Sequence, residues 1–326
     1  MINALKKLYL KNKTAFITGC CAIVFLIVAF AATGISSKQL RDLATSAAIL
    51  GIVALGQMLV IFVGGIDFSM QWLLCSSGIL ITKLYVSNML SQTGLPIIAL
   101  LLIVLAASTA VGCLNGVGIA YFSINPIIMT FCTNVLLHGI MLAWTNGISG
   151  QFAPPEITNF LNQSWGGIPV LVYIWAIITV AATFILSKTT FGRKLYAISF
   201  NQRAAYYSGI RLKKIKMAAY CISGFVAGLG GILMAANEGR SYLGMGDNMI
   251  IQSILVVFIG GTSLGNNRGN YIGTVIGTIA LTLLAFLLTK LHIPSGFERM
   301  IFGVILMATL IATSPKKTSS SQKVLI

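Results

Sequence analysis

Residues 62–72, FVGGIDFSMQW, interrupt a chain that is almost purely apolar on either side. The stretch holds two adjacent glycines, Gly64 and Gly65, followed by Asp67 and Ser69, and Asp67 is one of only six acidic residues in the chain. An ionisable residue within a membrane span costs about 2.5–3.5 kcal/mol at the bilayer centre and usually faces a bundle interior or a water-filled path. Two interpretations follow: a broken helix beside a substrate path, or a plain turn in which the carboxylate caps the next helix.

The composition outside this stretch sets the class of protein. Of the 326 residues, 57% are hydrophobic and 9% are charged, and the mean hydropathy is +0.91. A soluble domain carries about 25% charged residues. Apolar runs of about 20 residues, each long enough to cross a bilayer as a helix, recur along the chain. The sequence predicts an all-α integral membrane protein, because a membrane β-barrel would instead alternate apolar and polar residues.

We expect about ten membrane spans in a single transmembrane domain that covers residues 1–326. The first apolar run follows a basic start, as in a signal peptide, but it is long enough to span and no small-residue cleavage site follows it, so we interpret it as a retained helix. The expected limits are 14–34, 44–63, 70–87, 95–121, 126–145, 168–187, 217–237, 249–264, 270–290 and 296–313.

The basic residues predict the orientation of these spans. They gather before the first span, in the loop 188–216, and in the tail 315–326, whereas the loop 146–167 contains no Lys or Arg. With ten spans, all three basic segments lie on one side, which the positive-inside rule identifies as the cytoplasm. Both termini are therefore expected in the cytoplasm and 146–167 outside. Short basic clusters beside membrane spans do not indicate nucleic-acid binding.

The loop 188–216 is expected to contain a short helix. Asn201 is a suitable N-cap, QRAAYYS makes about two helical turns, and Gly209 is suited to end them. One interpretation is a topology anchor on the anionic membrane leaflet. The small and aromatic side chains favour the other, which is docking on a protein. The residues expected to make that contact are Asn201, Gln202, Arg203, Ala204, Ala205, Tyr206, Ser208 and Gly209.

Two further polar islands stand among the apolar runs. The stretch 258–274, FIGGTSLGNNRGNYIGT, offers glycines for tight turns or for close helix packing. In INPIIMT, residues 124–130, Asn125 precedes Pro126 and is either part of a path or a helix cap. With the first stretch, these give the candidate pathway and helix-break residues Gly64, Gly65, Asp67, Ser69, Asn125, Gly260, Gly261, Thr262 and Ser263.

Motifs of catalysis and nucleotide binding are missing from the sequence. It contains no GxxxxGK[ST] phosphate loop and no HExxH. His138 and His292 lie far apart, and the cysteines, none in a CxxC pair, are interpreted as small buried hydrophobes. We therefore expect no catalytic residue, metal site or bound cofactor in this chain. The six cysteines are Cys20, Cys21, Cys75, Cys113, Cys132 and Cys221.

The polar islands, taken in order, resemble a known family. GGIDFS at 64–69, NPIIMT at 125–130, FGRKLYAISFNQRAAYYSGI at 191–210 and IGGTSLGNNRG at 259–269 are similar to the membrane-spanning permease of bacterial ABC importers for monosaccharides. The resemblance covers essentially the whole chain, including the order and spacing of the motifs. Related permeases handle nucleosides and autoinducer-2, so the class of solute is an inference from the family.

The resemblance implies a fold and a set of partners. The fold is the ten-helix importer type with a cytoplasmic coupling helix between helices six and seven, in the bacterial inner membrane. Two permease subunits, as a homodimer or heterodimer, form the pathway. A separate cytoplasmic ATPase binds ATP and Mg²⁺, and an extracytoplasmic binding protein delivers the solute. In the outer loop NEGRSYLGMGDN, Glu238, Arg240 and Asp247 either contact that binding protein or are simply solvated.

Two other classes of function remain as alternatives. A secondary transporter would couple solute movement to a proton or sodium gradient through Asp67. A membrane enzyme would use His138, His292 or the cysteines. Neither needs a long basic loop with a helix of docking size, so the sequence favours the ATP-driven importer, working by alternating access.

Overall fold

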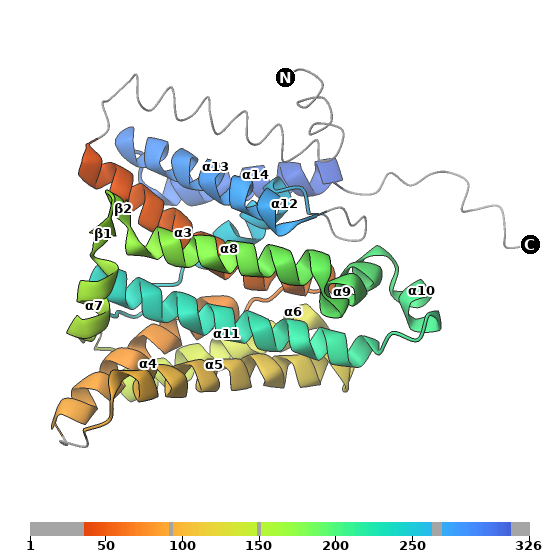
Figure 1. Ribbon diagram of the computed structural model, residues 1–326, viewed down its shortest axis with the longest axis horizontal. Helices are drawn as coiled ribbons and strands as arrows, with labels where there is room; N and C mark the ends of the chain where they lie inside the picture. Colours follow the sequence, from red (N-terminus) through yellow and green to blue (C-terminus); the bar gives the residue numbers. More distant parts are fainter. Residues whose placement is uncertain (1–35, 91–93, 149–150, 263–268, 314–326) are drawn as a thin grey trace, which may run out of the picture.

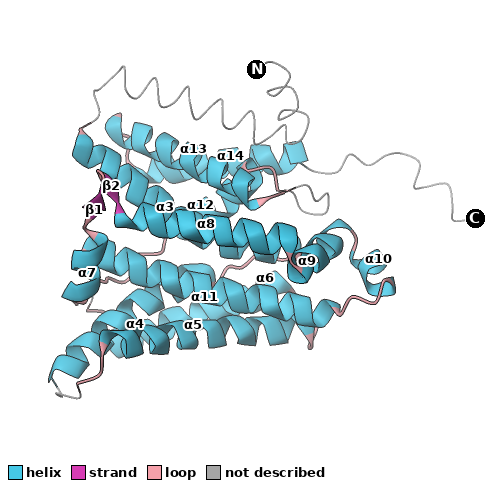
Figure 2. Cartoon of the chain, viewed as in Figure 1, coloured by secondary structure: helices cyan, strands magenta, loops and turns pink. Residues whose placement is uncertain are grey.

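The computed structural model describes residues 36–90, 94–148, 151–262 and 269–313. They form a bundle of helices, and the β-structure within these ranges is one short hairpin with an isolated bridge (Figures 1 and 2). The long helices are α3 (Ser37–Phe62), α4 (Met70–Leu90), α5 (Ile97–Ala120), α6 (Pro126–Thr145), α8 (Val170–Lys188), α11 (Leu212–Glu238), α13 (Tyr271–Lys290) and α14 (Ser295–Thr313). The shorter elements are α7 (Pro155–Leu161), β1 (Ser164–Trp165), β2 (Ile168–Pro169), α9 (Thr190–Phe200), α10 (Gln202–Tyr207) and α12 (Met249–Ile259).

Seven of the described helices, namely α3, α4, α5, α6, α8, α11 and α13, are long and apolar enough to cross a membrane. This confirms the predicted class, an all-α membrane protein. Helix α12 is apolar but has only 11 residues. Helix α14 is not among the seven, and the predicted first span, 14–34, lies outside the described residues, so the expected total of ten spans stays a prediction.

Several predicted boundaries differ from the observed helices. Helix α3 begins at Ser37 rather than at 44, because a capping box formed by Ser36 and Gln39 starts it in a polar stretch. Helix α12 ends at Ile259 rather than at 264. The loop 146–167 contains α7 and the hairpin strand β1, which were not predicted from the sequence.

Helices α3 and α11 form the centre of the bundle. In Figure 1, α8, α12, α13 and α14 lie with α3 in the upper part, and α4, α5 and α6 lie in the lower part, with α11 against both. Residues 47–62 of α3 are all buried. A helix that is apolar all round is expected to be enclosed by its neighbours, and α3 packs against α8, α11, α12 and α13.

Small residues allow α5 and α11 to approach closely. Gly112 and Gly116 on α5 face Gly224 and Met217 on α11, and a Cβ atom at Gly112 would lie 2.9 Å from the Cα atom of Gly224. Glycines four residues apart are typical of close helix pairs in membranes. This close helix contact thus depends on residues that have no side chain.

Two cysteines lie in the same contact. Cys113 on α5 and Cys221 on α11 form a disulfide, with their Cα atoms 4.5 Å apart. The interpretation of every cysteine as a small buried hydrophobe was therefore wrong for this pair. It was wrong for Cys132 too, which is free and exposed, and it holds for Cys75, which is free and buried.

The outer faces of α5, α6 and α8 are apolar and exposed. Leu102 is 61% exposed, Phe131 is 54% exposed and Ile177 is 68% exposed. Large exposed apolar surfaces on long apolar helices are the faces that lipid covers in a membrane protein. Several polar side chains of α5 and α6, such as Asn115 and Thr130, are instead buried in the bundle.

The bundle has two distinct ends. The segment with α9 and α10 lies at one end, here named the α10 end, and α7 with the hairpin of β1 and β2 lies at the other, here named the hairpin end (Figure 1). Because α3 starts at the hairpin end, where Arg41 donates to the Asn162 carbonyl at 3.0 Å, it finishes near the α10 end. The loop of residues 63–69 that follows α3 therefore lies toward the α10 end.

Candidate functional site

The loop 63–69 joins α3 to α4, and its two glycines are required by geometry. Gly64 has φ +84°, which ends α3, and the Gly65 amide donates to the Val60 carbonyl at 3.0 Å. A side chain at Gly65 would collide with the hydroxyl of Tyr220, which is fully buried. The chain leaves the helix at these residues, which both interpretations of the stretch expected.

Asp67 follows the glycines and is only 1% exposed. Its Oδ1 accepts hydrogen bonds from the Ser69 amide at 3.0 Å and from the Ser69 hydroxyl at 2.6 Å. Its Oδ2 accepts from the Ser223 hydroxyl of α11 at 2.7 Å. The carboxylate thus caps its own loop at Ser69 and ties that loop to α11.

The hydrogen bonds continue into two more helices. Asn115 of α5 donates through Nδ2 to the Ser69 hydroxyl at 2.9 Å, and Thr133 of α6 donates to Asn115 Oδ1 at 2.6 Å. We name Asp67, Ser69, Asn115, Thr133 and Ser223 the Asp67 cluster. A buried polar network whose members are satisfied holds its elements in one arrangement. Asp67 and Ser69 were predicted from the sequence as site residues, whereas their three partners on distant helices were not.

Helix α6 braces the same loop through two more side chains. The Phe68 amide donates to Thr130 Oγ1 at 3.1 Å, and the Trp72 amide donates to Asn134 Oδ1 at 3.1 Å. Asn125 lies at the start of α6, where its side chain accepts from the Ile127 amide at 2.9 Å. In this conformation Asn125 therefore acts as a helix cap, and its part in a pathway remains a proposal.

The second glycine cluster lies elsewhere in the bundle. Gly260 ends α12 and packs against the backbone of Gly273 on α13, where no Cβ atom fits. Gly261 has φ +90°, and Thr262 is fully buried. These residues pack on α13, whereas the Asp67 cluster joins α5, α6 and α11. The candidate Ser263 lies outside the described residues.

The connection between α8 and α11 contains the expected short helix, α10. Its start is capped by Asn201, whose Oδ1 accepts from the Ala204 amide at 3.0 Å, and it is followed by Gly209 with φ +79°. The connection also contains α9, which the sequence analysis missed although Thr189 caps it by accepting from the Gly192 amide.

Most of α10 is exposed. Tyr206 is 65% exposed and Tyr207 is 85% exposed, and the side chains of Asn201, Arg203, Ala204 and Ser208 are also exposed. Ala205 is different, since it is 4% exposed and packs into the core. The exposed surface of α10 is therefore formed by the other residues, and the contact of all eight with a partner stays a prediction.

A groove separates α10 from α9. It has a volume of about 500 Å³, and Arg193 and Phe200 line it together with residues of α10. Phe200 is 74% exposed. An exposed mixture of aromatic and basic side chains around a groove is typical of a protein-binding surface.

One side chain joins α10 to the glycine loop. Gln202 Nε2 donates to the Val63 carbonyl at 3.1 Å, and the same nitrogen lies where a side chain at Gly64 would stand. Val63 directly precedes the break that leads to Asp67. The two candidate sites that the sequence indicated, one for docking and one for the helix break, are thus in direct contact.

The two histidines lie on different parts of the bundle. His138 stacks on Trp72 with ring centroids 4.1 Å apart, and His292 lies after α13. Among the described residues there is no group of three or more His, Cys, Asp or Glu side chains that could hold a metal ion.

Comparisons with known proteins identify the class. Residues 39–310 match the family model described as the permease component of the branched-chain amino acid transport system. This match covers most of the chain, so the chain belongs to that family. No solved structure is found to match it.

Curated relatives are similar over nearly the full length. The ribose import permease protein RbsC of Haemophilus influenzae is 28% identical over 282 residues, which cover 85% of each chain. The D-allose transport system permease protein AlsC of Escherichia coli is 26% identical and covers 85% of this chain and 83% of its own length. The autoinducer 2 import system permease protein LsrC of Escherichia coli is 29% identical, with 89% and 85% covered.

These matches confirm the predicted class of protein. The chain is the permease subunit of an ABC importer and not an enzyme, and the resemblance to permeases of the ribose type is confirmed. They favour this function over the gradient-driven alternative centred on Asp67.

Proposed function

We propose that this permease carries a monosaccharide, or a small polar solute of similar size, into the cytoplasm of a bacterium. The names of the ribose, D-allose and autoinducer 2 permeases support this class of solute. The family description names amino acid transport instead. For the class of solute, the individual relatives are the stronger evidence. The ribose and D-allose relatives are named sugar permeases, and more than four fifths of the length of each aligns with this chain.

The proposed energy source is a separate ATPase in the cytoplasm, which binds ATP and Mg²⁺ and docks on α10. The observation that carries this proposal is the hydrogen bond from Gln202 to Val63. Through this bond, a displacement of α10 can move Val63 and the Gly64–Gly65 turn that follows it. Asp67 lies four residues after Val63 and would move with them. The exposed Arg203, Tyr206 and Tyr207 supply the docking surface.

The remaining assembly follows from the same function. A second permease subunit completes the pathway, and a binding protein delivers the solute at the hairpin end. This assigns the α10 end and both termini to the cytoplasm, and it requires ten spans in the inner membrane. The apolar outer faces of α5, α6 and α8 contact lipid. The loop around Gly64 and Asp67 and the turn around Gly260 are the elements that rearrange when access alternates.

Co-purification tests the docking surface. The tagged chain is extracted from its native membrane in mild detergent, and the proteins that accompany it are identified. We expect an ATPase with the native chain and its loss from the double variant Arg203→Glu, Tyr207→Ala. Both side chains are exposed, so neither change disturbs the core.

A matched variant controls for charge. Lys188→Glu changes the same kind of exposed basic residue at the end of α8, and it is expected to retain the ATPase. An ATPase that still accompanies the Arg203→Glu, Tyr207→Ala variant in native amounts would contradict docking through α10.

A further inference from the structure

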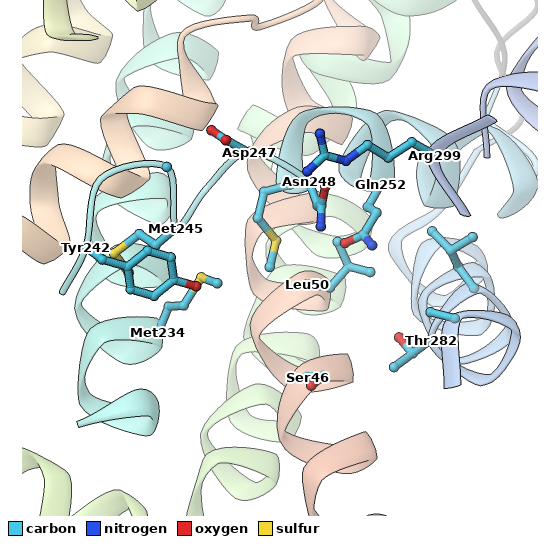
Figure 3. A pocket seen from close by; sticks show the side chains of 14 residues that line it. Ser46, Leu50, Met234, Tyr242, Met245, Asp247, Asn248, Gln252, Thr282 and Arg299 are labelled. Atoms are coloured by element: carbon cyan, nitrogen blue, oxygen red, sulfur yellow. The ribbon is translucent and has the colours of Figure 1, made fainter. Parts of the chain in front are cut away.

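A polar pocket opens at the hairpin end of the bundle (Figure 3). It has a volume of about 430 Å³ and is formed by α3, the end of α11, the loop 239–248, α12, α13 and α14. Pockets that bind small molecules usually measure about 300–1,000 Å³. It lies within a single chain and at the end of the bundle opposite to α10.

Three side chains reach the pocket with their hydrogen-bonding groups unused. Asn248 is the N-cap residue of α12 but makes no side-chain cap bond. Gln252 lies one helical turn later and therefore on the same face, and Arg299 extends toward both from α14 (Figure 3). None of the three side chains has a hydrogen bond to another residue in the described part of the chain. Together they present amide and guanidinium donors and amide acceptors.

The fourth polar group of the pocket is the carboxylate of Asp247, which is held by a residue outside the lining. Gln71 of α4 donates through Nε2 to Asp247 Oδ1 at 2.9 Å. The Asp247 amide donates to the Gly244 carbonyl at 2.9 Å, which fixes the backbone of the loop. The second carboxylate oxygen of Asp247 remains available as an acceptor. A binding site requires such support, because an acceptor must be oriented before the ligand arrives.

Apart from the hydroxyl groups of Ser46, Tyr242 and Thr282, the rest of the lining is apolar. Leu50 of α3 is 4% exposed and Met245 is 4% exposed, and Tyr242 and Met234 stand beside them (Figure 3). An apolar wall suits the C–H face of a sugar ring, and a few placed polar groups suit its hydroxyls. One carboxylate and one guanidinium in the same pocket leave it without net formal charge.

We propose that this pocket binds a neutral polyhydroxylated solute of monosaccharide size, as the first site that the solute occupies in this chain. Asp247 accepts from hydroxyl groups, Arg299 donates to them, and Asn248 and Gln252 do both. A neutral pocket with two amides selects a polyol over a carboxylate or an amine, either of which would need an excess of opposite charge. The inference rests on the proposed function and adds to it a solute site in each permease chain.

Cysteine protection tests the site directly. Asn248→Cys and Gln252→Cys are made in a Cys132→Ser background, because Cys132 is the exposed free cysteine of the described residues. The full transporter, with its ATPase and binding protein, is reconstituted in liposomes. Uptake of tritiated D-ribose, D-allose, D-galactose and D-xylose is measured first, and a transported sugar then serves as the protecting ligand against a membrane-impermeant maleimide.

At a sugar concentration about ten times the Kd, labelling at both positions should slow about tenfold. Labelling of Ser164→Cys, exposed on the hairpin, should not change. In uptake assays, Asn248→Ala and Arg299→Gln should each raise KM about 2- to 10-fold, the usual effect of one lost hydrogen bond. ATPase co-purification should be native in both variants.

Three results would overturn the inference. A transported sugar that protects neither cysteine would locate the first solute site elsewhere while leaving the ATP-driven importer intact. Uptake of none of the four sugars, together with uptake of a charged amino acid, would contradict the neutral ligand class. Unchanged KM in both uptake variants would exclude the pocket from the transport cycle. Failure of the proposed function is recognised separately, by the absence of an ATPase from the purified complex.

Discussion

The side-chain amide of Gln202 donates a 3.1 Å hydrogen bond to the backbone carbonyl of Val63, joining the first turn of α10 to the end of α3. Gly64 follows with a backbone conformation, φ +84°, that other residues rarely adopt, and a Cβ atom there would stand 2.8 Å from the same amide. The surface proposed for ATPase docking is therefore in direct contact with the loop that joins α3 to α4. Transmission of movement through this contact is a claim about coupling and has to be tested as one.

Gln202→Ala removes this link without removing the docking surface. We expect ATP-driven uptake to fall several-fold while the ATPase remains bound, because Arg203 and Tyr207 still face outward. The measurement is initial uptake rate together with ATPase co-purification. Gln163→Ala, the same change at an exposed position of the hairpin end, serves as the control and should transport normally. Native uptake by Gln202→Ala would refute the coupling role.

Asp67→Ala should destabilise the protein strongly. It removes the acceptor of three hydrogen bonds and leaves the hydroxyls of Ser69 and Ser223 buried without that partner. Each buried group left unsatisfied costs roughly 1–3 kcal/mol. Asp67→Asn should be milder, because its carboxamide oxygen still accepts. The check is thermal unfolding of the purified variants, with exposed Asp42→Asn as the control. Equal melting temperatures for Asp67→Ala and the native protein would count against the structural role of the cluster.

Asp67→Asn also distinguishes uptake driven by ATP from uptake driven by a proton or sodium gradient. A carboxylate that is 1% exposed and accepts three hydrogen bonds is occupied as a structural group. We therefore expect residual uptake by Asp67→Asn to remain dependent on ATP and insensitive to a protonophore. Uptake that tracks a proton or sodium gradient in the native protein, and loses that coupling in the variant, would restore the gradient-driven alternative.

Gly112→Ala tests the contact between α5 and α11. The new methyl group would lie 2.9 Å from Gly224 Cα and 3.0 Å from Gly224 N, and overpacking of this kind costs about 1–3 kcal/mol. Gly139→Ala on α6 is the matched control, since a Cβ atom there meets nothing within 4 Å. We expect a lower melting temperature for Gly112→Ala and an unchanged or higher one for Gly139→Ala. The same melting temperature for both variants would contradict the tight packing.

The long helices were predictable because an apolar run long enough to cross a membrane can adopt few structures other than a helix. The runs at 70–87 and 126–145 begin at the observed residues, Met70 and Pro126. The polar start of α3 and the whole of α9 were not predicted. Their sequences mix charged and apolar residues, so the signal lay in the caps Ser36 and Thr189.

The site was predictable in part. Asp67 and the glycines before it stand out in an apolar context, and Asn201 and Gly209 delimit α10 as expected. The partners of Asp67 could not be found in the same way, because Ser223 lies 156 residues away and reads as an ordinary small residue of a membrane helix. The spacing of Gly112 and Gly116 was a usable signal that the analysis did not use.

ATP dependence of uptake by the reconstituted system tests the central claim most directly. The chain, its ATPase and its binding protein are placed in liposomes, and uptake of tritiated D-ribose, D-allose, D-galactose and D-xylose is measured with ATP, with a non-hydrolysable analogue, and with ion gradients alone. The account predicts uptake of at least one sugar that requires ATP hydrolysis and the binding protein and survives collapse of the gradients. Uptake by this chain alone, driven by a proton or sodium gradient, would contradict it.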